Sequence, residues 1–91
     1  MINANVVKGV HELLDEHGIK PKPDEAFGDM VARALGISGR QSEILLESLH
    51  EGGSVDEAVA AAEIDTSHLE RDILVRIARA IGTALGRVNR S

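Results

Sequence analysis

The fold is decided in the stretch Ser38–Glu57, SGRQSEILLESLHEGGSVDE. A capping box is a serine followed three residues later by Gln or Glu, whose side chains bond to free backbone amides at a helix start. The stretch contains two of them, Ser38 with Gln41 and Ser54 with Glu57. The glycine pair between the two boxes is typical of a turn. The stretch therefore predicts two consecutive helices, over residues 39–51 and 55–63.

Similar signals predict three further helices on either side of this stretch. Apolar residues at spacings of three and four predict one helix over residues 3–17 and another over residues 24–35, each followed by a glycine. A third capping box, Ser67 with Glu70, predicts that the longest helix spans residues 68–88. No segment alternates apolar and polar residues as a strand does. We therefore expect an all-α fold, a small bundle of four or five short helices with a long C-terminal helix.

The composition indicates one small domain over residues 1–91. Hydrophobic residues make up 43% of the chain and aromatic residues 1%, so Leu, Ile, Val and Ala must build the core, with Phe27 as its single ring. The absence of cysteine excludes disulfides, thiolate metal sites and cysteine nucleophiles, and leaves a reducing cytoplasm as the default location. We find no signal peptide and no run of about 18 apolar residues, so we expect no membrane partner.

Charge is unevenly distributed along the chain. The formal net charge is −5, which argues against a strongly basic clamp for nucleic acid. Residues 66–91 contain five arginines and two carboxylates and carry a net +3, so residues 1–65 carry −8. Most acidic side chains fall opposite the apolar stripes, where an ordinary helix faces solvent. The acidic first part is the natural surface for a protein partner.

No pattern in the sequence indicates a catalytic site, a cofactor or a metal. The run HELLDEH at residues 11–17 superficially resembles a zinc-protease motif, but its histidines are six residues apart instead of four and do not share a helical face. The glycines lack the preceding strand and the Lys-Ser/Thr pair of a phosphate-binding loop. We therefore expect a non-enzymatic protein that needs no cofactor.

Two overlapping segments resemble helix-turn-helix DNA-binding domains. The first centres on VARALGIS at residues 31–38, with apolar residues at the buried positions, a small Ala32 at the helix crossing and Gly36 at the turn. The resemblance implies that the helix after this turn lies in the major groove of DNA. It also implies that Arg40 and Gln41, near the start of that helix, face the base edges.

The second segment, residues 44–73, resembles the three-helix DNA-binding heads of small phage packaging proteins and resolvases. Its phrase is SVDEAVAAAEIDTSHL at residues 54–69, in which Ile64 fills the turn. The resemblance implies that His68 and Arg71, near the start of the third helix, face the groove of the DNA. Both matches stay open as alternatives.

The last predicted helix has two faces that indicate contacts with partners. On one face lie four arginines that are suited to phosphates: Arg76, Arg79, Arg87 and Arg90. On the apolar face, residues at alternating spacings of three and four form the seam expected where two helices pack along each other. The seam consists of Leu74, Ile77, Ile81, Ala84 and Val88. We predict that this seam pairs two copies in a homodimer, or else that the same face packs on the first three helices.

These patterns favour a small non-enzymatic DNA-binding or regulatory protein of helix-turn-helix type that acts as a homo-oligomer. In this hypothesis the arginine face holds phosphates, and either Arg40 with Gln41 or His68 with Arg71 reads the DNA. The alternative is a helical adaptor that binds another protein and not DNA. The acidic first part of the chain is then the binding surface.

Overall fold

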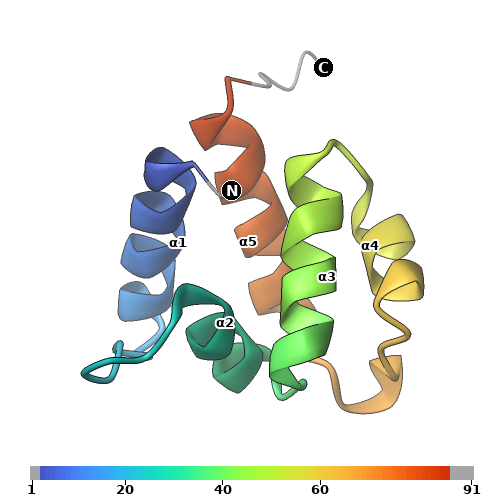
Figure 1. The fold of residues 1–91 in the computed structure, drawn as a ribbon, viewed down its shortest axis with the longest axis horizontal. Coiled ribbons are helices and arrows are strands. Elements are labelled where there is room, and N and C mark those ends of the chain that lie inside the picture. The colour runs from blue at the N-terminus through green and yellow to red at the C-terminus, as the bar shows by residue number, and fades with distance from the viewer. Residues whose placement is uncertain (1–2, 87–91) are drawn as a thin grey trace.

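The described part of the chain is a succession of helices with no strand. The computed structural model describes residues 3–86, which form five α-helices and one 3-10 turn (Figure 1). In chain order these are α1 (Ala4–Glu16), α2 (Phe27–Leu35), α3 (Gly39–His50), α4 (Val55–Ala61), η1 (Thr66–His68) and α5 (Arg71–Ala84). With 14 residues, α5 is the longest of these helices. The expected all-α bundle with a long C-terminal helix is confirmed.

Two of the three predicted capping boxes are present. The hydroxyls of Ser38 and Ser54 accept hydrogen bonds at 3.1 Å from the amides of Gln41 and Glu57. In return, the Gln41 and Glu57 side chains accept bonds at 3.0 Å from the two serine amides. These reciprocal bonds satisfy donors that have no partner within a helix. As a result, α3 and α4 begin at the predicted residues.

The predicted start of the last helix is wrong. The carboxylate of Asp65 accepts a hydrogen bond from the Ser67 amide at 2.9 Å and closes the 3-10 turn η1. Leu69 is then extended, and α5 begins at Arg71 without a side-chain cap. Ser67 therefore does not cap α5, because it lies inside the turn that Asp65 organises.

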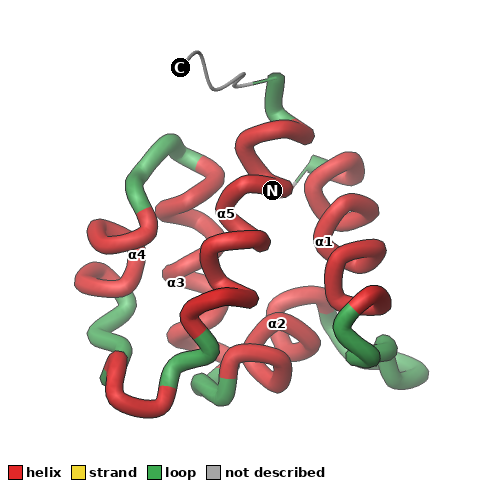
Figure 2. Tube along the Cα trace, turned by 180° about the vertical axis from the view of Figure 1, so that it is seen from behind, coloured by secondary structure: helices red, strands yellow, loops and turns green. Residues whose placement is uncertain are grey.

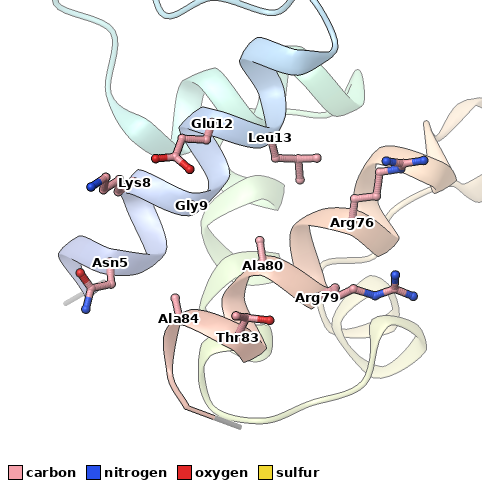
Figure 3. A pocket seen from close by; sticks show the side chains of 10 residues that line it. All are labelled: Asn5, Lys8, Gly9, Glu12, Leu13, Arg76, Arg79, Ala80, Thr83 and Ala84. Atoms are coloured by element: carbon pink, nitrogen blue, oxygen red, sulfur yellow. The ribbon is translucent and has the colours of Figure 1, made fainter. Parts of the chain in front are cut away.

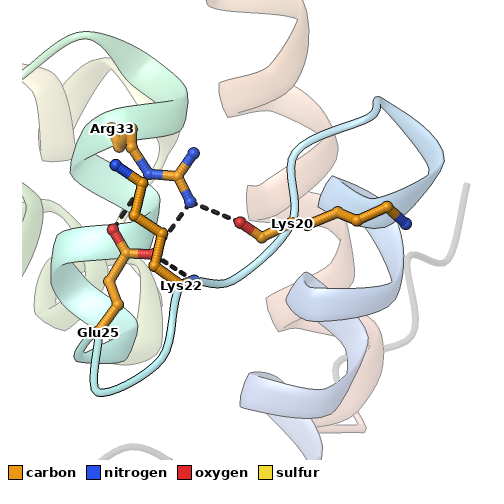
Figure 4. A network of polar contacts seen from close by, with 4 residues as sticks. All are labelled: Lys20, Lys22, Glu25 and Arg33. Atoms are coloured by element: carbon orange, nitrogen blue, oxygen red, sulfur yellow. Dashed lines mark hydrogen bonds and ion pairs between the residues drawn. The ribbon is translucent and has the colours of Figure 1, made fainter.

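The second helix also begins later than predicted, at Phe27 instead of residue 24. Asp24 has a positive φ of 64°, and Ala26 is extended at the N-cap position, so neither can belong to the helix. The carboxylate of Glu25 instead bonds to the amide of Lys22 and to the guanidinium of Arg33 on α2 (Figure 4). This network fastens the connector before α2 onto the helix itself.

The core lies between α5 and the helices that surround it. α1 runs along α5, while α3 contacts α2, α4 and α5. α3 is on the near side in Figure 1, and α5 is on the near side in Figure 2, which shows the opposite face. All five helices contribute aliphatic side chains to one buried cluster, among them Val10, Leu14, Met30, Leu35, Leu46, Val59, Leu74 and Ile77. The apolar stripes predicted from the sequence thus face one another.

The apolar face of α5 belongs to this core and not to a seam between two copies. Leu74 and Ile77 are 0% exposed and Ile81 is 1% exposed, because other helices of the same chain cover them. Ala84 is half-buried beside α1, and Val88 lies outside the described residues. For the first three seam residues the alternative prediction holds, since Leu74, Ile77 and Ile81 pack within their own chain and cannot reach a partner without unpacking the core.

Candidate interaction surfaces

The segment of the first resemblance forms the junction of α2 and α3. Gly36 ends α2 with a left-handed φ of 72°, a conformation that glycine adopts without steric cost. Ala32 is 5% exposed, which lets α2 approach its neighbours closely. Ser42, where helix-turn-helix domains usually bury an aliphatic side chain, is fully buried and hydrogen-bonded to Gly28. Membership of the helix-turn-helix class stays a prediction.

Only one of the two residues expected to read DNA from α3 has a free side chain. Both polar ends of Gln41 are engaged, since its oxygen accepts from the Ser38 amide and its nitrogen donates to the Glu63 carbonyl at 3.3 Å. Arg40 is exposed and forms no ion pair with any described residue. The outward side of α3 also carries Glu43 and Glu47, which repel phosphate.

The segment of the second resemblance spans α4, the turn η1 and the start of α5. Glu63 takes a left-handed φ of 54° where this pattern prefers glycine, and Ile64 is 8% exposed and fills the turn. His68, however, is an exposed residue of η1 and does not lie on α5. The guanidinium of Arg71 is paired with the Asp56 carboxylate of α4 at 3.1 Å. The structure therefore does not bring His68 and Arg71 together at the start of one α-helix.

A groove of about 750 Å³ lies between α1 and α5 (Figure 3). Its floor consists of small or apolar residues: Gly9, Leu13, Ala80 and Ala84. Lys8 and Glu12 of α1 border one side, and Arg76 and Arg79 of α5 extend away from α1 on the other side. The cations Lys8, Arg76 and Arg79 form no ion pair with any described residue. The expected Arg87 and Arg90 lie outside the described residues.

A second groove, of about 600 Å³, lies where α1, α2 and α3 meet. Val7, Phe27 and Leu46 supply an apolar floor. Four exposed carboxylates border this floor: Asp29, Glu43, Glu47 and Glu51. The sequence pattern indicated ordinary solvated faces for most acidic residues and did not indicate this groove. The available signal was the spacing of Glu43, Glu47 and Glu51, which recur every four residues and so share one side of α3.

The two charged surfaces belong to different helices. The carboxylates belong mainly to α3, on the near side in Figure 1, and the arginines belong to α5, on the near side in Figure 2. The molecule measures 24 Å along its shortest axis, which is the viewing direction of Figure 1. The uneven charge of the sequence thus becomes an acidic face and a basic face.

Within residues 3–86, no three His, Asp or Glu side chains lie together in a way that could hold a metal ion. None of the helices formed by these residues is long and apolar enough to cross a membrane. Comparison with protein-family models, curated proteins and solved structures gave no match to this chain.

Proposed function

We propose that this protein is a non-enzymatic DNA-binding protein that holds duplex DNA by its phosphates, through the outer face of α5. The observation that carries the proposal is the pair Arg76 and Arg79, which are both exposed and have no carboxylate partner among the described residues. Lys8, across the groove on α1, adds a third cation. Free cations on one side of a protein release condensed counterions when they meet phosphates.

Contact is expected with the sugar-phosphate backbone and not with the bases. The side chain of Gln41 is occupied by two hydrogen bonds, and Arg71 is paired with Asp56. A sequence-specific contact needs free donors and acceptors aimed at base edges, whereas phosphate contacts fix position without reading sequence. The protein is therefore expected to bind different duplexes with similar affinity.

The net charge of −5 is compatible with this proposal because the charges are segregated. Salt screens charges beyond a Debye length of about 8 Å at physiological ionic strength. Carboxylates of α3 that lie farther than this from DNA bound at α5 are therefore largely screened from it. At very low salt the Debye length grows to about 30 Å, and the acidic face begins to repel the DNA.

The proposal is tested by fluorescence anisotropy with a labelled duplex of about 20 base pairs near 50 mM salt. Wild-type protein is expected to bind, and Arg76→Ala with Arg79→Ala should weaken binding about tenfold or more. Arg40→Ala is a control that removes one exposed cation at the start of α3, and its effect should stay within about twofold. Absence of binding by the wild type, or an equal loss in both variants, contradicts the proposal and favours the adaptor alternative.

A further inference from the structure

The acidic groove between α1, α2 and α3 combines an apolar floor with a border of one charge. Phe27 is half-buried and stacks on His11 with ring centroids 5.8 Å apart, which holds the floor in place. The four bordering carboxylates form no ion pair within residues 3–86. Glu43 and Glu47 are four residues apart on α3, and like charges at this spacing destabilise a helix. No ion pair with a described residue compensates for this repulsion. An apolar surface with positive charge beside it is the complement of this groove.

The chain itself carries such a surface on the outer face of α5. Val75 is 38% exposed and is the one exposed large hydrophobic side chain among the described residues. Val75 lines a shallow depression on the surface of α5. The other residues that line it are Asp72, Arg76 and Arg79. An exposed apolar side chain thus lies beside two arginines on the same molecule that carries the acidic groove.

We infer that the acidic groove of one copy binds the outer face of α5 of a second copy. Val75 enters the apolar floor, and Arg76 and Arg79 meet Glu43 and Glu47 on α3. The spacings agree, because residues three or four apart on a helix lie one turn apart, about 5 to 6 Å. The contact covers apolar surface that is otherwise wet and gives partners to both sets of charges.

The placement of the two surfaces determines the form of the assembly. Groove and basic face are two different surfaces of the domain, so the contact between them is heterologous and joins copies head to tail. It leaves a free groove at one end and a free basic face at the other, so it produces open chains instead of closed dimers. The ion pairs are exposed and therefore weak and sensitive to salt. This inference does not depend on DNA binding, although both contacts use the same arginines.

A charge-swap experiment without DNA tests the inference. The groove variant is Glu43→Arg with Glu47→Arg, and the face variant is Arg76→Glu with Arg79→Glu. The association of each variant is measured by sedimentation velocity at about 0.5 mM protein and near 50 mM salt, because exposed ion pairs are little screened at this salt concentration. Wild-type protein should form oligomers that grow with concentration, and each variant alone should be monomeric. An equimolar mixture of the two should associate again, because the swapped charges attract and one native contact remains.

The matched control for the groove variant is Glu16→Arg with Glu63→Arg. It makes the same change in net charge as the groove variant, at two exposed residues outside the groove. It should associate at least as well as the wild type. Circular dichroism should give equal helix content for all variants, since the substituted side chains are exposed. A monomeric wild type under these conditions overturns the inference, as does a mixture that fails to restore association.

Discussion

The hydroxyl of Ser42 on α3 donates a hydrogen bond of 2.6 Å to the backbone carbonyl of Gly28 on α2. Ser42 is fully buried, so its hydroxyl is shielded from water that would compete for this bond. We predict that Ser42→Ala lowers the free energy of unfolding by about 1 kcal/mol or more. Ser67→Ala, at an exposed position, is the control and should change stability by less than about 0.5 kcal/mol. Urea denaturation measures both, and equal values for the two variants contradict this role for the bond.

The two glycines Gly9 and Gly36 are expected to respond to alanine with opposite signs. Gly9 lies inside α1, and a Cβ added there meets nothing within 4 Å. Gly9→Ala should therefore stabilise the protein by about 0.5 to 1 kcal/mol, through its higher helix propensity. Gly36→Ala should destabilise it by about 1 kcal/mol, because residue 36 has a φ of 72°. Thermal melts compare the two, and a Gly9→Ala variant less stable than the wild type would show that α1 needs a glycine there.

Acid is expected to weaken the attachment of the connector before α2. Two hydrogen bonds from Arg33, at 3.1 and 3.0 Å, are the main cause that lowers the pKa of Glu25 from 4.5 to about 2. A carboxyl whose pKa falls on folding stabilises the folded state above its unfolded pKa, and this stabilisation disappears as it is protonated. Stability should therefore decline as the pH falls from 4.5 towards 2.

Thermal melts at pH 6 and pH 3 of wild type and Glu25→Gln measure this effect. The amide cannot lose a charge, so the variant should be less stable at pH 6 and should lose less on acidification than the wild type does. Equal pH dependence in the two proteins would show that other carboxylates cause the acid sensitivity.

Ile81 provides a test of the corrected role of α5. Because Ile81 is 1% exposed within a single chain, Ile81→Ala should cost about 2 to 4 kcal/mol through lost burial and a cavity. At high salt, where surface charge pairs are screened, the melting temperature should not depend on protein concentration. A melting temperature that rises with concentration under these conditions points back to the seam between two copies.

Local signals predicted the fold well, and contacts between distant residues account for the errors. The boxes that begin α3 and α4 involve residues three apart, and the sequence pattern alone was sufficient to find them. The start of α2 depends on Glu25 and Arg33, which are eight residues apart. The start of α5 was predicted wrongly because the side chains of Asp65 and Ser67 can both bond to backbone amides. In the structure the carboxylate of Asp65 bonds to the Ser67 amide.

The same distinction applies to the candidate surfaces. Helical periodicity predicted that Arg76 and Arg79 share an exposed face, and both are exposed. It could not indicate that Arg71 pairs with Asp56, 15 residues away, or that Gln41 bonds to the Glu63 carbonyl, 22 residues away. These tertiary contacts decide which polar side chains remain free to bind a partner.

The dependence of duplex affinity on salt tests the proposed DNA contact most directly. If Lys8, Arg76 and Arg79 each neutralise one phosphate, a plot of log K against log salt above about 50 mM should have a slope near −3. Arg76→Ala with Arg79→Ala should reduce the magnitude of that slope by about 2, because two contacts are lost. A slope that is the same in wild type and variant, or an affinity of the wild type that salt does not change, would contradict DNA binding through α5.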